Sequence, residues 1–235
     1  MSIVNRQSEL EHNWSSTMAD IKQACDEANR NIDDVTVIAV TKTWPATDVD
    51  VLAQLGVHHV GENRDQEAKE KHTQVKAQDL IWHAIGQIQT NKVKSIIAWA
   101  DVVHSVDRIE LVQMFAKHLD GANKTLDVFV QVNLDEQHSG GRGGVQQAEV
   151  LDLVELIAKN PCFRLLGVMG VAPLHGDAKQ AFADLQSISG LVQQVAPEAK
   201  YISAGMSDDY KIALKYGATH LRLGSLILGH RTYSG

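Results

Sequence analysis

Lys42 is the residue of this chain whose position best suits covalent chemistry. It follows an apolar, β-branched run over residues 35–41, and such a run is typical of a strand buried on both faces of a parallel sheet. A lysine at the carboxyl end of such a strand lies where α/β folds carry their active sites. Partial desolvation favours the neutral amine of a lysine, which can form a Schiff base with an aldehyde or ketone. Taken alone, Lys42 could instead extend into water.

Two short segments near the carboxyl end of the chain could hold a phosphate group. Gly205 and Ser207 precede a predicted helix, and Gly224 and Ser225 follow a predicted strand. Free backbone N–H groups at such junctions bind anions, and (β/α)8 barrels frequently bind phosphate after their seventh and eighth strands. Ser207 taken alone could equally be the N-cap of the following helix.

Other residues of types that can do chemistry are expected to have structural roles. The glycine-rich residues 139–144 lack the features of a P-loop and the full GxGxxG spacing, so we expect a flexible loop. His58 and His59 would point to opposite faces of a strand, and no HxxxH pair occurs, so no metal site is predicted. His83 lies in a predicted strand and is expected to be a hydrogen-bonding wall residue.

The elements that must position these residues alternate regularly. Strands are predicted at residues 35–41, 57–61, 80–85, 101–105, 126–133, 165–169, 201–204 and 220–223. Helices are predicted to begin near Ala46, Arg64, Thr90, Asp107, Val145, Asp177 and Ser207. This alternation predicts an α/β fold, a single (β/α)8 TIM-type barrel. An open doubly wound sheet is the alternative.

The first residues predict an additional helix. Apolar residues recur at helical spacing between Leu10 and Ala28, which indicates a helix within about residues 1–31 that packs on the outside of the barrel. No linker or repeat divides the chain, so residues 1–235 are expected to form one domain.

A closed parallel barrel would gather the residues that follow its strands at one mouth. In chain order they are Lys42, Glu62, Asn63, His83, Gln89, Ser105, Asn133, Met169, residues 203–207, Arg222, Gly224 and Ser225. Each could be a turn or cap residue, but together they predict a polar binding site.

Composition excludes several classes of protein. Hydrophobic residues make up 44% of the 235 residues, charged residues make up 22%, and the formal net charge is −7. This charge disfavours nucleic acid as a partner, because phosphate contacts require a basic surface. We find no secretory signal and no window near the roughly 18 consecutive apolar residues of a membrane span. Cys25 and Cys162 are far apart, which argues against a disulfide framework. We expect a cytoplasmic protein with no membrane partner.

A series of short motifs resembles the YggS/PROSC family. They are Ala39-Val40-Thr41-Lys42, Gly61-Glu62-Asn63 with Gln66-Glu67, Trp82-His83-Ala84-Ile85-Gly86 with Gln89 and Asn91-Lys92, His104-Ser105-Val106-Asp107, Gln131-Val132-Asn133, Gly205-Met206-Ser207-Asp208 and Leu221-Arg222-Leu223-Gly224. Members are pyridoxal 5′-phosphate (PLP) homeostasis proteins, single-domain relatives of the alanine racemase barrel. The resemblance runs from the first strand to Arg231.

The resemblance implies PLP as the cofactor and a role for particular residues. Lys42 matches the lysine that forms the internal aldimine, and Ser207, Gly224 and Ser225 match the phosphate-binding positions. It implies no catalytic residue and no metal. Arg64 and Asp65 depart from the family pattern, where a tyrosine and an aliphatic residue are frequent. Two further departures, at Arg142 and Leu228, concern loop details.

Three residues would surround the cofactor ring in this resemblance. Arg222 matches the arginine that faces the pyridine nitrogen, and Asn63 and His83 match residues that line the pocket. An arginine can only donate hydrogen bonds, whereas a carboxylate would keep the nitrogen protonated and make the ring a strong electron sink. The resemblance therefore implies a weak stabiliser of carbanions.

These observations favour a PLP carrier over an enzyme. We expect a monomer that stores or transfers PLP with little or no catalysis, and PLP-dependent apoenzymes are candidate recipients. A PLP-dependent amino-acid racemase is the alternative, although we expect no second domain of the kind that gives racemases a tyrosine base. A third hypothesis is an aldolase-type barrel that uses Lys42 without a cofactor.

Overall fold

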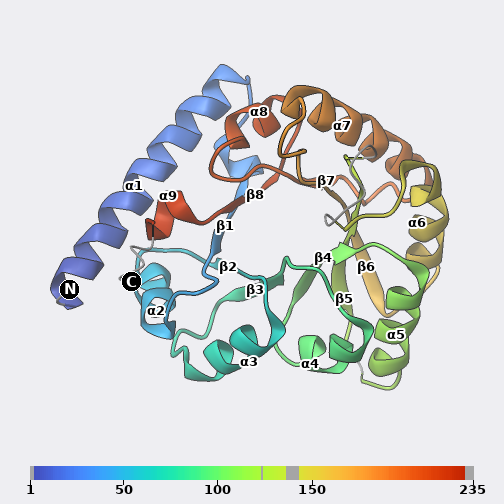
Figure 1. The fold of residues 1–235 in the computed structure, drawn as a ribbon, viewed down its shortest axis with the longest axis horizontal. Coiled ribbons are helices and arrows are strands. Elements are labelled where there is room, and N and C mark those ends of the chain that lie inside the picture. Colours follow the sequence, from blue (N-terminus) through green and yellow to red (C-terminus); the bar gives the residue numbers. More distant parts are fainter. Residues whose placement is uncertain (1–2, 123, 136–142, 231–235) are drawn as a thin grey trace.

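Eight parallel strands close into a barrel in sequence order, and β8 pairs with β1 (Figure 1). The computed structural model describes residues 3–122, 124–135 and 143–230, with side chains from residue 5 onward. The strands are β1 (Thr36–Val40), β2 (His59–Glu62), β3 (Ile81–Ala84), β4 (Val102–Val106), β5 (Leu126–Gln131), β6 (Phe163–Met169), β7 (Tyr201–Ser203) and β8 (His220–Leu223). The predicted barrel is confirmed, and the alternative of an open doubly wound sheet is wrong.

Helices surround the barrel and connect the strands (Figure 1). They are α2 (Ala46–Gln54), α3 (Asp65–Gln74), α4 (Val93–Ile97), α5 (Ile109–Leu119), α6 (Val150–Ala158), α7 (Ala178–Val195), α8 (Tyr210–Lys215) and α9 (Ser225–Leu228). Short 3-10 turns lie at Ile32–Asp34, Thr90–Lys92 and Gln147–Glu149. Within the described ranges, no helix combines the length and the apolar character needed to cross a membrane.

The predicted additional helix is α1 (Ile3–Glu27), which runs along the outside of the barrel beside α9, α2 and α8 (Figure 1). Leu10 and Ile21 on its inner face are fully buried. Burial of such side chains contributes roughly 1.5–3 kcal/mol each, so an apolar stripe is sufficient to hold a helix that is otherwise polar.

The apolar core has a large outer part and a small part around Phe129. The outer part lies between the strands and the helices and includes Phe115, Phe182 and Leu185. The smaller cluster joins Phe129 to Val102 and Met169. Aromatic contacts extend the smaller cluster to histidines, as described below. Since side chains alternate between the two faces of each strand, residues two apart, such as His220 and Arg222 on β8, share a face.

Candidate functional site

The order of strands places the carboxyl ends of β7, β8, β1 and β2 side by side. Ala39 on β1 is opposite Leu223 on β8, and Val40 is opposite Gly61 on β2. Lys42 lies two residues beyond the end of β1. It is therefore flanked by the segment after β8 on one side and by the segment after β2 on the other.

Lys42 presents a free amine at this mouth. Its side chain is exposed rather than desolvated by the strand end. In the part of the chain that the structure describes, no hydrogen bond or ion pair involves the Lys42 amine. It is available to an incoming electrophile, and the expected partial burial is not observed.

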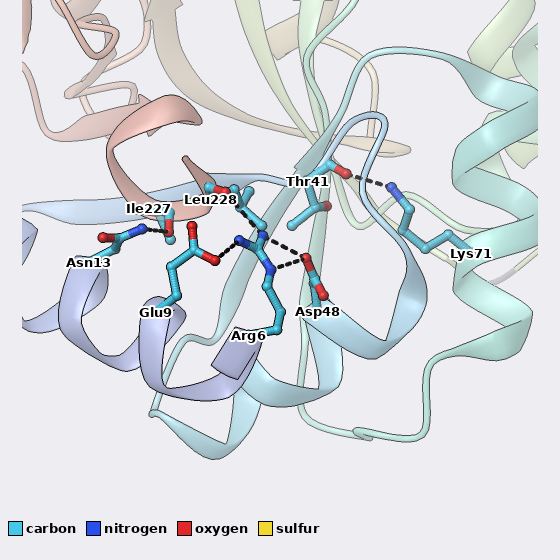
Figure 2. A network of polar contacts seen from close by, with 8 residues as sticks. All are labelled: Arg6, Glu9, Asn13, Thr41, Asp48, Lys71, Ile227 and Leu228. Atoms are coloured by element: carbon cyan, nitrogen blue, oxygen red, sulfur yellow. Dashed lines mark hydrogen bonds and ion pairs between the residues drawn. The ribbon is translucent and has the colours of Figure 1, made fainter. Parts of the chain in front are cut away.

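A second lysine holds the backbone on the amino side of Lys42. Lys71, on α3, is buried, and its Nζ donates to the Thr41 carbonyl at 2.6 Å. The same Nζ lies 2.5 Å from Glu62 Oε1 and 3.0 Å from Glu67 Oε1. The Thr41 hydroxyl also donates to Glu62, at 2.6 Å. Figure 2 shows the contact between Lys71 and Thr41. Lys71 therefore fixes the peptide immediately before Lys42.

Glu67 holds the backbone on the other side. Its Oε1 accepts from the Thr43 N–H, and Thr43 has a φ of 68°. A β-branched residue in this left-handed region is strained by about 1–3 kcal/mol, and the structure around it must supply that energy. Lys71 and Glu67 together hold the peptide groups on both sides of Lys42.

Glu62 lies away from the mouth, contrary to the expectation from its place after a strand. It is buried against Lys71, and Oε2 is a buried oxygen without a hydrogen-bond partner among the described residues. Burial raises the pKa of Glu62, although the hydrogen bonds from Lys71 and Thr41 act in the opposite direction. The carboxylate depends on Lys71, and its role is to complete the support of Lys42.

The segment after β7 leaves Ser207 free for a ligand. Gly205 has a φ of +91°, and a Cβ there would lie 2.9 Å from the Tyr210 backbone, so glycine is required. Helix α8 begins at Tyr210, with Asp209 at the N-cap position, so the alternative that Ser207 is the N-cap is wrong. Asp209 instead accepts from the Met206 N–H at 2.6 Å. Within the described ranges, no hydrogen bond occupies the Ser207 hydroxyl.

The segment after β8 contains Gly224 and Ser225, which begin the short helix α9. Gly224 lies against the end of β1, since a Cβ on it would be 3.6 Å from the Val40 carbonyl oxygen. Ser225 is half-buried. The predicted phosphate segments therefore follow neighbouring strands, with Lys42 after the next strand around the barrel.

Side chains of α1 hold the other end of α9. Arg6, Asn13 and Thr17 donate to the carbonyls of Leu228, Ile227 and Leu226, at 3.0, 3.2 and 3.3 Å respectively. Figure 2 shows two of these contacts, those of Arg6 and Asn13. These carbonyls have no acceptor role within so short a helix, so α1 caps α9 and fixes its position.

Arg6 also reaches the segment that follows Lys42. Its guanidinium is 2.7 Å from Asp48 on α2 and 2.9 Å from Glu9 (Figure 2). It lies over the ring of Trp44, 4.2 Å from the ring centre. Arg6 thus connects the loop after β1 with the end of α9. No sequence signal marked it, because Asp48, Trp44 and Leu228 are distant from it in the chain.

Arg222 lies inside the barrel, below the mouth. It is buried, and its Nη1 and Nη2 donate to Ser203 Oγ at 2.6 Å and to the Gly170 carbonyl at 3.0 Å. Burial lowers the pKa of Arg222 to about 10, and the nearby Asp209 opposes this shift. Arg222 is a buried cation whose hydrogen bonds to the described residues go to neutral oxygens.

The remaining predicted pocket residues are divided between the mouth and the interior. Asn63 is exposed just after β2, and a Cβ on Gly86 would lie 2.6 Å from its side-chain oxygen. His83 is buried in the barrel interior, where both ring nitrogens bond to other histidines. The predicted hydrogen bonding of His83 is observed, whereas its contact with a cofactor stays a prediction. Most of the glycine-rich stretch 139–144 lies outside the described residues.

This donor set fits a phosphorylated aldehyde. The Lys42 amine can attack a carbonyl carbon, the hydroxyls of Ser207 and Ser225 with nearby backbone N–H groups can hold a phosphate, and Arg222 can donate to a ring nitrogen. In the described residues, no three histidine, cysteine or carboxylate side chains converge as metal ligands.

Comparison with known sequences shows relatives that match most of this chain. The family model for the alanine racemase N-terminal domain matches residues 10–232. The pyridoxal phosphate homeostasis protein of Mycobacterium leprae is 34% identical over 241 residues, which cover 96% of this chain and 94% of that protein.

Two solved structures are also similar to this chain over most of its length. PipY of Synechococcus elongatus, whose structure was determined with PLP bound, is 27% identical with a TM-score of 0.78, over 94% of this chain and all of that one (100%). Alanine racemase from Corynebacterium glutamicum is 13% identical with a TM-score of 0.69, and shares the fold over 94% of this chain and 60% of its own length.

Proposed function

The chain belongs to the alanine racemase N-terminal domain family and, within it, to the pyridoxal phosphate homeostasis proteins, and on this premise we propose that it holds PLP reversibly through Lys42. When bound, PLP supplies an aldehyde with which a lysine amine can condense. The function is intracellular PLP homeostasis by storage or transfer, in the cytoplasm.

The observation that carries the proposal is the contrast between the two lysines near the mouth. Lys71 is buried and bonded to three oxygens, whereas Lys42 is exposed with a free amine at the described site. A rival amine can reach Lys42 from solvent and displace it, as a reversible carrier requires. Ser207, Gly224 and Ser225 bind the phosphate, Arg222 faces the pyridine nitrogen, and Asn63 and His83 complete the surroundings.

We further propose that catalysis is weak or absent. Arg222 cannot accept a proton from the pyridine nitrogen or share one with it as a carboxylate would, so the bound ring is a poor electron sink. The chain acts as a monomer and as a single PLP-binding domain over residues 1–235, and PLP-dependent apoenzymes are the recipients.

A spectrophotometric titration tests PLP binding. Adding PLP to the full chain should produce a visible absorption band that saturates, and Lys42→Ala should lack that band. Lys69→Ala, which removes an exposed lysine of α3, is the matched control and should behave like the unsubstituted chain. An unchanged spectrum in Lys42→Ala would overturn the assignment.

Deuterium exchange separates the carrier from the racemase. The PLP-loaded protein is incubated in deuterated water with a panel of amino acids, and exchange at Cα is followed by NMR. The carrier predicts negligible exchange above that of free PLP. Rapid exchange that depends on Lys42 would favour the racemase.

A further inference from the structure

Histidines in the barrel interior form a continuous series of hydrogen bonds that ends at Arg222. His59 Nδ1 lies 2.9 Å from His83 Nε2, and His83 Nδ1 lies 2.8 Å from His104 Nε2. His104 Nδ1 is 2.8 Å from Ser203 Oγ, which is 2.6 Å from Arg222 Nη1. The series crosses the barrel from β2 through β3, β4 and β7 to β8. Of these residues, the function proposed above uses only Arg222, which ends the series, and His83, which lines the proposed cofactor pocket.

The chemistry of arginine gives this series a direction. A guanidinium has donors and no acceptor, so Ser203 Oγ must accept from Arg222. Ser203 is fully buried, and His104 Nδ1 is the one acceptor within hydrogen-bond distance of its hydroxyl among the described residues. The hydroxyl hydrogen of Ser203 is therefore donated to His104 Nδ1. A neutral imidazole that accepts at Nδ1 carries its hydrogen on Nε2, and His104 Nε2 points to His83.

The same step repeats along the series. His83 accepts from His104 at Nδ1, so it carries its hydrogen on Nε2 and donates to His59 Nδ1. All three rings are thereby fixed as Nε2–H tautomers. The rings of His83 and His104 are fully buried, and burial lowers the pKa of both well below the ordinary range, with a further effect from charge on neighbouring groups. Neutral rings are what the series requires.

Arg222 needs such support because no carboxylate is bonded to it in the described site. Asp209 acts on it electrostatically but its own side chain is bonded to the Met206 amide. Hydrogen bonds arranged in one direction polarise one another, so the three rings strengthen Ser203 as an acceptor for the buried cation. They do this without placing a negative charge beside the ligand ring.

We propose that Ser203, His104, His83 and His59 form a one-way hydrogen-bond relay that holds the Arg222 guanidinium in a site without a carboxylate. They are positioning residues, since they act through Arg222. This assignment deepens the proposed function, and its importance for the ligand rests on that function. The direction of the relay is a property of the chain alone.

Histidine ring NMR tests the direction without any cofactor. In the full chain labelled with 15N-histidine, long-range 1H–15N correlations distinguish the two neutral tautomers. His59, His83 and His104 should each be Nε2–H at neutral pH. A protonated Nδ1 or a charged ring at any of the three would overturn the proposal.

Removal of Arg222, the donor at the end of the series, should allow the hydrogen bonds to run in either direction. In Arg222→Met, Ser203 can accept from His104, so His104 and His83 should show Nδ1–H populations, whereas Arg222→Lys keeps a donor and should keep the original tautomers. His220, whose Nδ1 contacts Thr219 Oγ1 at 2.9 Å, is an internal control that should not change. Unaltered tautomers in a folded Arg222→Met would contradict the relay.

Ser203→Ala provides an independent break if Arg222→Met does not fold. It should mix the tautomers of His104 and weaken PLP binding about threefold to tenfold, because a charged group loses an acceptor. Ser189→Ala removes another buried serine, on α7, and should change neither result. An unchanged PLP affinity in Ser203→Ala would contradict the positioning role. If the unsubstituted chain bound no PLP, the proposed function would fail while the NMR result stood.

Discussion

Lys71 and Lys42 lie near the same end of the barrel and illustrate two uses of one residue type. The buried Lys71 is bonded to the Thr41 carbonyl and to two glutamates. Lys42 is exposed and its amine is free at the described site. Because Lys71 and Glu67 bond to the peptides on either side of Lys42, they restrict the backbone from which the Lys42 side chain extends.

We predict that Lys71→Met weakens PLP binding and destabilises the fold. The substitution leaves Glu62 buried and unpaired, which costs about 3–5 kcal/mol, and it frees the Thr41 carbonyl. Urea denaturation measures the first effect, and titration of the visible band measures the second. Lys159→Met, which breaks an exposed pair with Glu155, should cost less than about 1 kcal/mol. Equal losses in the two variants would contradict this role.

Ser207 and Ser225 should act on the phosphate alone. A hydrogen bond to a charged group is worth about 1.5–3 kcal/mol, so Ser207→Ala combined with Ser225→Ala should weaken PLP binding by at least tenfold. Unphosphorylated pyridoxal should bind the variant and the unsubstituted chain almost equally. Competition titrations with the two compounds provide the comparison, and a parallel loss for both would exclude this phosphate site.

Residue patterns predicted which candidate side chains lie after the ends of strands. The spacing of apolar residues and the residue types in turns were sufficient to select the residues that follow strands, which are Lys42, Ser207, Gly224 and Ser225. Lys71 and His104 were not predicted to support the site, because their partners come from other elements. The Glu67 to Lys71 spacing on α3 was the available signal for Lys71.

At the scale of elements, α1 and α9 work as a pair. The four-residue α9 (Ser225–Leu228) is too short to be stable by itself. Its carbonyls are capped by Arg6, Asn13 and Thr17 of α1, and Leu228 and Ile227 are buried. The helix outside the barrel therefore fixes the helix that begins at the predicted phosphate segment.

We predict that Arg6→Met lowers the free energy of unfolding by about 3 kcal/mol. The buried Asp48 loses two hydrogen bonds that Arg6 donates to its Oδ2, and removal of one member of a buried pair is costly. PLP binding should weaken as α9 loosens. The control is Arg164→Met, which breaks an exposed pair with Asp127 and should cost less than about 1 kcal/mol. Indistinguishable denaturation curves for the two variants would show that Arg6 does not stabilise the contact between α1, α2 and α9.

Strand positions were predictable from the apolar runs, and each predicted boundary lies within two residues of the observed one. Helix starts were less predictable. Helix α6 was expected near Val145 and begins at Val150, after a 3-10 turn, because Val145 pairs with Val132 in an isolated bridge. Helix α9 was not predicted, since α1 supplies its caps from a distant part of the chain.

At the scale of the whole molecule, the barrel interior is unusual because it contains histidines packed against aromatic rings. His104 stacks on Phe129, and His220 meets Phe129 and Tyr201 edge to face. Burial lowers the pKa of His220 to about 3, with smaller effects from His59 and Arg222. A histidine with a lowered pKa in the fold binds its proton more tightly after unfolding. Its contribution to stability is therefore present above pH 6.5 and is lost as the pH falls from about 6.5 towards 3.

We predict that acid destabilises the protein through these rings. Each histidine that stays neutral in the fold lowers the free energy of unfolding by about 2 kcal/mol at pH 5 relative to pH 7. His220→Gln should reduce the loss of unfolding free energy between these pH values by about that amount, measured by urea denaturation. His12→Gln, at an exposed position of α1, should have no such effect. An unchanged loss in His220→Gln would argue that the ring is charged in the fold.

The attachment of PLP to Lys42 is the central claim, and peptide mapping after borohydride reduction tests it most directly. The full chain is mixed with PLP, reduced and digested, and the modified peptide is identified by mass spectrometry. We expect the added mass on the peptide that contains Lys42, and none on that peptide when reduction precedes PLP. Modification of Lys71 or other lysines with Lys42 unmodified would contradict the assignment.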